Sequence, residues 1–246
     1  KHFYQGKNLI ISAAGPIDHD QLVIECQKHF KSRKPFTATK QRRVPRWKVH
    51  RKVYEHDMEQ AHILVGFPAT SFNDKYRFEA FILNALLGGG MTSRLYQAIR
   101  EKRGLAYTVF SSLNSNVDSG SICIYAGTDA RNTKQVIQII ADELLKIKKR
   151  GLKARDVNLF KTQVRGQLLM GSDEIENRMA SLGVNEMIFE KYKSVDSIIA
   201  EVEKVSLDSV MEYIEMYFNL AKVSAVLLGP NLKQHEAWLK NLDFSK

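Results

Sequence analysis

Apolar and polar positions alternate with two different periods along this chain, so it is expected to mix short strands with helices. Apolar runs predict strands near residues 8–15, 47–56, 61–68, 107–114, 120–127 and 222–229. A helical period predicts helices over 18–30, 73–87, 92–102, most of 131–218 and 231–242. The turn-forming residues 115–119 lie between two of the predicted strands, and they predict a hairpin there.

Polar residues and glycines mark where several of the predicted helices begin and end. Asp18 and Ser206 have side chains that can cap a helix N-terminus. Breaks are expected near residues 150–151, 171–172 and 193–194. Residues 31–46 contain two prolines and have no period, so they are interpreted as a linker between residues 1–30 and residues 47–246.

The two ends of the chain follow one plan. Residues 8–30 and 222–244 each contain an apolar strand, a Gly-Pro turn and a helix that ends at Phe, at a constant offset of 214 residues. One interpretation is a generic strand-turn-helix unit. The other is that residues 31–244 form one complete unit and residues 1–30 are the tail of an earlier one, of which 184 residues are missing. Spacing alone leaves both open.

The net charge of +10 lies almost entirely in one block that overlaps the linker. Its eleven cations, with no acid among them, are Lys28, Lys31, Arg33, Lys34, Lys40, Arg42, Arg43, Arg46, Lys48, Arg51 and Lys52. We interpret the block as a solvated linker. The alternative is polyanion binding, but the interleaved aromatic residues of a single-strand reader are absent, so nucleic acid is not the expected partner.

Composition and spacing exclude several classes of protein. The chain is 44% apolar, but no apolar run approaches the about 18 residues that cross a bilayer, so no membrane span is expected. No zinc spacing, serine-hydrolase elbow or phosphate loop occurs. The residues that come nearest to a metal pattern are His50, Glu55, His56, Cys26, His29 and His62, and we interpret them as surface or interior side chains.

Three consecutive glycines, Gly88, Gly89 and Gly90, follow an apolar helix. They are expected to end that helix in a left-handed conformation and to let the backbone approach a neighbouring element closely. Thr92 or Ser93 is expected to cap the next helix.

The most distinctive stretch runs from Leu86 to Ser111, with Gly-Gly-Gly-Met-Thr-Ser-Arg near its start and Arg-Glu-Lys-Arg-Gly-Leu-Ala-Tyr from Arg100. It resembles the zinc metallopeptidases of the pitrilysin and insulinase type (peptidase M16), which include mitochondrial processing peptidase. The likeness is to their second, C-terminal half, and it extends over essentially the whole chain. Further matching segments in the family's order are 8–18, 61–68, 118–129, 177–179 and 228–230.

The resemblance implies a fold and a function. The implied fold is α+β, with an antiparallel-rich mixed sheet and helices on one face, the LuxS/processing-peptidase-like fold of metallopeptidase halves. The implied function is a substrate-binding half that completes the peptide-cleavage site of a zinc-bearing half or partner subunit. No cofactor is expected in this chain, because the inverted zinc motif His-x-x-Glu-His is absent from it. The chain alone is therefore predicted to be inactive. The alternative is a non-enzymatic scaffold or interaction subunit on the same fold.

The resemblance also implies roles for particular residues. Arg100 and Tyr107 are expected to contact a peptide carbonyl, and Gly88, Gly89 and Gly90 are expected to lie at the rim of the substrate cavity. Spacing agrees, because Gly104 allows a tight return between a helix that ends near Arg100 and a strand that begins near Tyr107. The alternative is that Arg100 is a helix-end cation and Tyr107 a packing residue.

Because residues 8–15 lack their parent sheet, self-association through this segment is also expected.

Overall fold

The computed structural model describes residues 9–30 and 43–246, which fall into two compact units. The sheet unit comprises Val44–Val164 and Glu201–Lys246, and the helical unit comprises Lys1–Arg43 and Arg165–Ala200. Each is described by itself below. The predicted boundaries at residues 30 and 46 stay a prediction, since residues 31–42 lie outside the described part of the chain.

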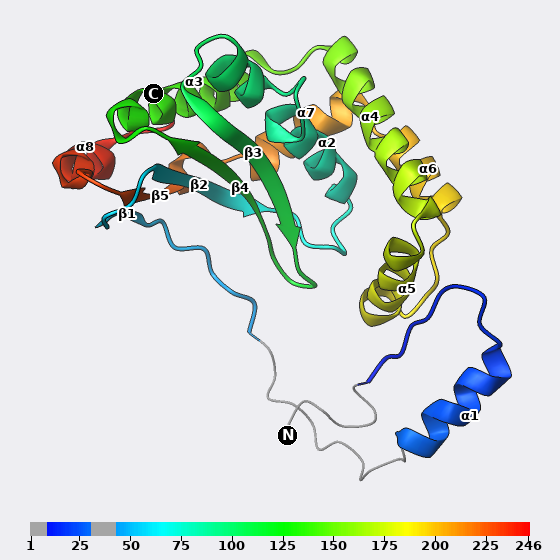
Figure 1. The fold of residues 1–246 in the computed structure, drawn as a ribbon. Coiled ribbons are helices and arrows are strands. Elements are labelled where there is room, and N and C mark those ends of the chain that lie inside the picture. Colours follow the sequence, from blue (N-terminus) through cyan, green and yellow to red (C-terminus); the bar gives the residue numbers. More distant parts are fainter. Residues whose placement is uncertain (1–8, 31–42) are drawn as a thin grey trace. The chain divides into compact units, whose positions relative to one another are not determined.

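A mixed five-stranded sheet forms the centre of the sheet unit (Figure 1). The strands are β1 (Arg51–Glu55), β2 (Ala61–Ala69), β3 (Ala106–Ser115), β4 (Gly120–Thr128) and β5 (Ser224–Gly229). Their order is β1-β5-β2-β4-β3, in which β1 runs parallel to β5 and the other neighbours are antiparallel. The predicted hairpin at 107–127 and the strand near 222–229 are both confirmed.

Helices account for most of the remaining chain. The α-helices are α1 (His19–His29), α2 (Arg77–Gly88), α3 (Thr133–Arg150), α4 (Ala154–Asp173), α5 (Ile175–Phe189), α6 (Val195–Glu203), α7 (Leu207–Tyr217) and α8 (Glu236–Asn241). A π-helix, η2 (Tyr96–Glu101), and the short 3-10 turns η3 (Ala130–Asn132), η4 (Leu220–Lys222) and η5 (Lys233–His235) complete the described structure.

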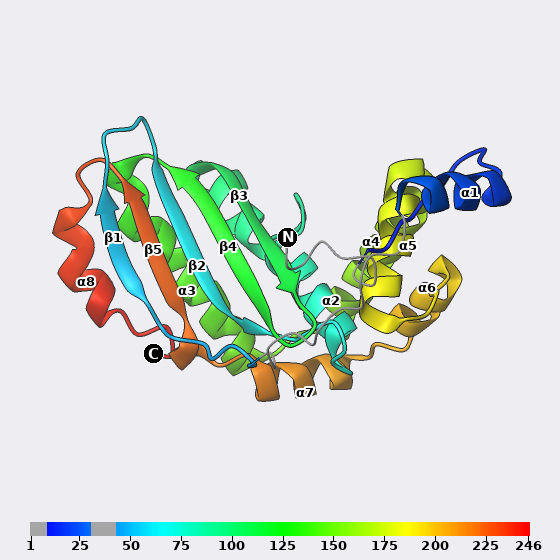
Figure 2. The same cartoon turned by 90° about the horizontal axis from the view of Figure 1, so that it is seen from below.

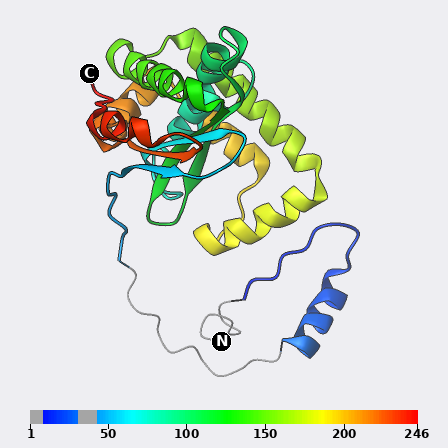
Figure 3. The same ribbon diagram turned by 60° about the vertical axis from the view of Figure 1, so that its left-hand side comes forward.

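The core of the sheet unit lies on one face of the sheet, where α2, α3 and α7 pack (Figure 2). Alternate residues of β2 point into it, including the fully buried Ile63 and Val65. Helix α8 lies beside the edge strand β1 (Figure 3). Nη1 of Arg51 donates to the carbonyl oxygen of Lys240 at 3.2 Å. A mixed, mainly antiparallel sheet covered by helices on one side is the predicted fold class, which is confirmed.

The opposite face of the sheet carries residues that are only partly buried. Leu64 of β2 and Phe110 of β3 are among its exposed apolar residues, and Tyr54 of β1 lies at its far edge. Antiparallel sheets commonly have one face in the core and one open face. In the sheet unit taken by itself, this face of the sheet is therefore partly open to solvent.

The helical unit contains a correction to the sequence analysis. Asp18 caps α1 as predicted, because its Oδ1 accepts a hydrogen bond from the Gln21 N–H at 2.9 Å. The strand predicted over residues 8–15 is wrong for its described part, since residues 9–15 have no strand structure. A strand is stabilised by hydrogen bonds to a neighbour, and none of the five strands pairs with this segment.

Several predicted boundaries shift in the structure. Helix α4 continues to Asp173 through the predicted break at 171–172, and the helix predicted over 92–102 becomes the π-helix η2. The break after residue 150 is confirmed, where Gly151 has a φ of +66°. Most of the basic linker lies outside the described residues, so its interpretation is untested. Among the described helices, none has both the length and the apolar character that crossing a membrane requires.

Candidate functional site

Arg100 and Tyr107, the expected substrate contacts, lie against each other in the sheet unit. Nη1 of Arg100 donates a hydrogen bond to the main-chain carbonyl oxygen of Tyr107 at 2.8 Å. The guanidinium carbon of Arg100 lies 4.5 Å from the centroid of the Tyr107 ring, within range of a cation–π attraction. Because Tyr107 is 77% exposed, most of its phenol faces solvent.

A glycine makes the return from Arg100 to Tyr107 possible. Gly104 follows η2 with a φ of +60°, and its N–H donates to the carbonyl oxygen of Arg100 at 2.9 Å. The N–H of Leu105 donates to the carbonyl oxygen of Ile99 at 3.0 Å. A side chain with a Cβ would be strained at this φ. The tight return predicted through Gly104 is confirmed.

Tyr107 lies at an irregularity of the edge strand β3. Ala106 pairs with Thr128 and Thr108 pairs with Gly127, so Tyr107 is the extra residue of a bulge in the β3–β4 ladder. Along β3 exposed and buried residues otherwise alternate near this point, but Tyr107 and Thr108 are both exposed. Bulges re-aim side chains and are frequent beside active sites. The bulge therefore turns two successive side chains towards solvent.

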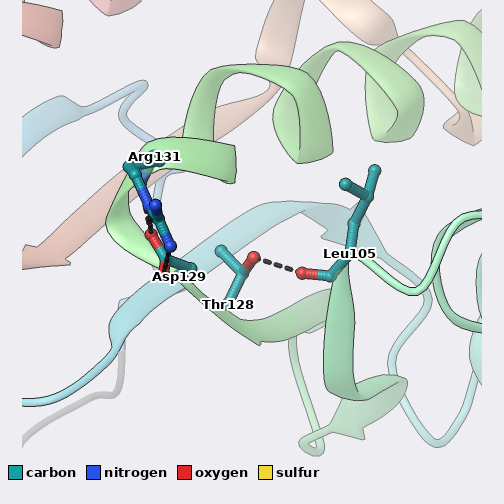
Figure 4. A network of polar contacts seen from close by, with 4 residues as sticks. All are labelled: Leu105, Thr128, Asp129 and Arg131. Atoms are coloured by element: carbon teal, nitrogen blue, oxygen red, sulfur yellow. Dashed lines mark hydrogen bonds and ion pairs between the residues drawn. The ribbon is translucent and has the colours of Figure 1, made fainter.

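The turn before Tyr107 is anchored to the end of β4 (Figure 4). The buried hydroxyl of Thr128 donates a hydrogen bond to the carbonyl oxygen of Leu105. The next residue, Asp129, accepts hydrogen bonds from Nε and Nη2 of Arg131 at 3.0 and 2.8 Å. The bonds from the side chain and main chain of Arg131 lower the pKa of Asp129 from its usual 3.8 to about 2. Asp129 is therefore a carboxylate at neutral pH.

Gly88 makes the close approach that was predicted, but the glycines do not adopt the predicted left-handed conformation. A Cβ on Gly88 would lie 2.3 Å from the main-chain nitrogen of Ser111 in β3, so only glycine fits there. The prediction of a left-handed C-cap is wrong, since Gly89 caps α2 with a φ of −81° and donates its N–H to the carbonyl oxygen of Ala85. A right-handed cap suffices here because the next residues turn without a positive φ.

The glycine loop is not brought into contact with the Arg100–Tyr107 pair. Gly88 meets β3 at Ser111, four residues beyond Tyr107, which is about 13 Å along a strand. The predicted cap at Thr92 or Ser93 is not formed either, because η2 begins without a side-chain cap, and the Ser93 hydroxyl donates back to the carbonyl oxygen of Gly90 at 2.5 Å. The expected role of this loop at a cavity rim stays a prediction.

Metal-ligating side chains do not converge in the part of the chain that the structure describes. No group of three His, Cys, Asp or Glu residues there could hold a metal ion. Nδ1 of His56 contacts the carbonyl oxygen of Asp57, whereas His62 contacts Tyr125, and Cys26 and Cys123 are both free. These residues do not fit a zinc site.

Two sets of aromatic contacts in the sheet unit were not identified from the sequence. The Tyr96 ring centroid lies 5.1 Å from the guanidinium carbon of Arg100. On the open face, the Tyr125 hydroxyl lies 2.7 Å from Nδ1 of His62, and its ring centroid lies 5.2 Å from that of Phe110. Helical spacing of four residues could have indicated Tyr96. His62 and Tyr125 are 63 residues apart, and no local signal joins them.

The sequence matches known proteins over most of its length. Residues 1–164 match a family model described as the peptidase M16 inactive domain. A protein of Mycobacterium tuberculosis named as an uncharacterized zinc protease is 30% identical over 233 residues, which are 93% of this chain and 53% of that protein. Another of this name from Bacillus subtilis is 32% identical over 208 residues, 85% of this chain and 51% of that protein. The chain thus spans about half the length of these relatives.

Solved structures have the same fold at lower sequence identity. The peptidase M16 inactive domain from Pseudomonas fluorescens has a TM-score of 0.74 and 20% identity, over 88% of this chain and 52% of that one. A chain of complex III2 from Candida albicans has a TM-score of 0.72 and 14% identity, over 87% of this chain and 53% of that one. These likenesses to solved structures show the fold alone. The family is shown by the family model, which matches 164 of the 246 residues. The chain belongs to the peptidase M16 family.

Proposed function

We propose that this chain is the substrate-binding, zinc-free half of an M16 metalloendopeptidase and that it completes the cleavage site of a zinc-bearing half. The observation that carries the proposal is the contact of Arg100 with Tyr107 at the bulged end of an edge strand. The relatives named zinc proteases are about twice as long as this chain, which leaves room for a zinc-bearing half. The proposed partners are that half and a peptide substrate.

The two side chains offer hydrogen-bond donors suited to a peptide carbonyl. The bond to Tyr107 uses one of the five N–H donors of the Arg100 guanidinium. The Tyr107 phenol, whose ring contacts the Arg100 guanidinium, adds an O–H donor. When water adds to a peptide bond, the carbonyl oxygen gains negative charge. Donors that bind this charge favour the transition state over the substrate and so raise the rate.

Zinc enters this proposal only through the other half. A zinc ion there would lower the pKa of its bound water and so supply the nucleophile. The described residues of this chain do not fit a zinc site, so we assign them binding and orientation of the peptide. We therefore expect this chain alone to hydrolyse no peptide.

The alternative is a non-enzymatic scaffold or interaction subunit. The likeness to a chain of complex III2 supports it at the level of the fold, with a TM-score of 0.72. One fold can serve unrelated functions, so the site decides between the two proposals. A scaffold subunit would not need Arg100 and Tyr107 for turnover in any assembly.

The test is an activity assay of this chain joined to its zinc-bearing half. Tyr107→Phe should lower kcat and kcat/KM together by roughly 100- to 1000-fold, because it deletes a donor used mainly in the transition state. Arg100→Ala should do as much or raise KM as well. Tyr54→Phe, an exposed tyrosine of the opposite edge strand β1, is the matched control and should leave kcat/KM unchanged.

The double variant provides a further check. If Arg100 and Tyr107 act on one carbonyl, their combined loss should be smaller than the product of the two single losses. Tyr107→Phe should keep the wild-type melting temperature, since the ring and its contact with Arg100 remain. Wild-type turnover in both single variants would rule out the proposed role. Reading the gene upstream of this segment for His-x-x-Glu-His would test whether the zinc motif is encoded on the same chain.

A further inference from the structure

The guanidinium of Arg100 lies within range of two aromatic rings. Its central carbon is 5.1 Å from the ring centroid of Tyr96 and 4.5 Å from that of Tyr107. The hydrogen bond from Nη1 to the Tyr107 carbonyl oxygen fixes one edge of the group. An arginine side chain has much rotamer freedom to lose, so these three contacts restrict a group that would otherwise move widely.

Tyr96 and Arg100 lie four residues apart on the π-helix η2, so their side chains are neighbours on its surface. Lys102 donates its N–H to the carbonyl oxygen of Gln97 at 3.1 Å, a bond that spans five residues instead of four. π-turns are rare and are frequent at functional sites. Tyr96 is half-buried on this helix, whereas Tyr107 is reached only across the Gly104 turn. The Tyr96 ring therefore belongs to η2 and the Tyr107 ring to β3, so the position of the Tyr96 ring does not depend on the strand.

We propose that Tyr96 is a positioning residue, whose ring holds the Arg100 guanidinium so that its remaining N–H donors face the substrate carbonyl. This rests on the proposed function, because it gives Arg100 a substrate to bind. The contact is made by the ring of Tyr96, so the hydroxyl is dispensable. Tyr96 acts through Arg100 and touches no substrate itself.

The substitutions follow from that assignment. In the assembly with the zinc-bearing half, Tyr96→Leu removes the aromatic face but keeps an apolar side chain, and kcat/KM should fall by about 3- to 30-fold. Tyr96→Phe should retain wild-type kcat/KM. In an Arg100→Ala background, Tyr96→Leu should have no further effect on kcat/KM. A merely structural Tyr96 would lower the activity of both backgrounds by the same factor.

A second measurement reports on Arg100 without any activity. Nitrogen-15 NMR of arginine side chains measures the mobility of the guanidinium in the chain alone, with the Arg100 signal assigned from Arg100→Lys. Mobility should increase in Tyr96→Leu and stay at the wild-type level in Tyr96→Phe. If Tyr96→Leu does not fold, Tyr96→Met serves the same purpose. Unchanged Arg100 mobility in the folded variant would overturn the proposal.

The outcomes separate this inference from the proposed function. If Arg100→Ala lowers kcat/KM while Tyr96→Leu leaves it at the wild-type value, the positioning role is wrong and the proposed function stands. If Arg100→Ala itself retains wild-type turnover, the proposed function is wrong, and the positioning role falls with it. Higher Arg100 mobility together with the background-dependent loss of kcat/KM supports both.

Discussion

The hydroxyl of Thr128 donates a hydrogen bond to the carbonyl oxygen of Leu105, and this bond joins the end of β4 to the turn between Arg100 and Tyr107 (Figure 4). Thr128→Val keeps the shape of the side chain but removes the donor. Because Thr128 is buried, we expect the free energy of unfolding to fall by about 1–3 kcal/mol.

Urea unfolding followed by tryptophan fluorescence measures this change, since both tryptophans, Trp47 and Trp238, belong to the sheet unit. Thr108→Val, an exposed threonine of the neighbouring strand β3, is the matched control and should change the stability by less than about 0.5 kcal/mol. Equal effects of the two substitutions would contradict the anchoring role of Thr128.

The close approach of α2 to β3 predicts that Gly88→Ala is destabilising. The added Cβ would lie 2.3 Å from the Ser111 nitrogen and 2.8 Å from the Phe110 carbonyl carbon, so backbone must move. We expect a loss of about 1–3 kcal/mol in the same unfolding experiment. Gly90→Ala is the control, because its Cβ would meet only the end of the Gln163 side chain, at 3.2 Å. A Gly88→Ala protein of wild-type stability would show that α2 and β3 are less closely packed.

We expect that substituting Glu79 of α2 stabilises the sheet unit. It is 7% exposed, and its Oε2 has no hydrogen-bond partner among the described residues. Burial, followed by the nearby carboxyl and phenol groups of Asp74, Tyr217 and Glu79, raises the pKa of Tyr213. Glu79→Gln replaces this buried, partly unpartnered carboxyl group with an amide of similar size and should raise the free energy of unfolding by about 1–3 kcal/mol.

A nearby carboxylate offers the control for Glu79. Glu212 is exposed and accepts a hydrogen bond from the Tyr76 hydroxyl at 2.8 Å. Glu212→Gln should therefore leave the unfolding free energy within about 0.5 kcal/mol of wild type, or lower it. Denaturant titrations of the wild type, Glu79→Gln and Glu212→Gln at one pH compare their free energies of unfolding. A Glu79→Gln protein less stable than wild type would contradict the prediction, because it would mean that the folded chain stabilises the Glu79 carboxyl group.

Asp129 predicts a pH dependence of stability. Its pKa is about 2 in the folded chain, lowered by the bonds from Arg131, whereas an unfolded aspartate has a pKa near 3.8. A depressed folded pKa contributes stability above the unfolded pKa, and this contribution is lost as the pH falls from about 4 to about 2. Asp129→Asn should therefore be less stable than wild type above pH 4, with the difference vanishing near pH 2. Unfolding curves across this range test it, and a difference independent of pH would contradict it.

Residues 9–15 predict self-association of this chain when it is studied alone. Leu9, Ile10 and Ile11 are exposed, and the segment pairs with no described strand. Unpaired apolar segments tend to pair with another chain. Sedimentation velocity should show concentration-dependent association that Ile10→Lys weakens, whereas Val117→Lys, an exposed apolar residue of the β-hairpin turn, should not. A monomer at all concentrations would contradict the prediction.

Features that depend on neighbours in the chain could be predicted from the sequence. The Asp18 cap, the Ser206 cap and the hairpin turn at 115–119 all appear where their residues indicated them. The contact between Arg100 and Tyr107 belongs to the same group, because a glycine within a seven-residue span is enough to return the chain. The substrate role of this pair came from the family resemblance and stays a proposal.

Features that depend on distant residues were decided only by the tertiary structure. The apolar run at 8–15 has strand character, yet its described part forms no strand because no neighbouring strand supplies hydrogen bonds. Gly88 is needed for its distance from Ser111, not for a left-handed φ. The contact of His62 with Tyr125 joins two strands that are adjacent only in the folded sheet. Local conformation follows from short-range sterics and hydrogen bonds, whereas these contacts form between residues whose separation in the chain does not indicate their distance in space.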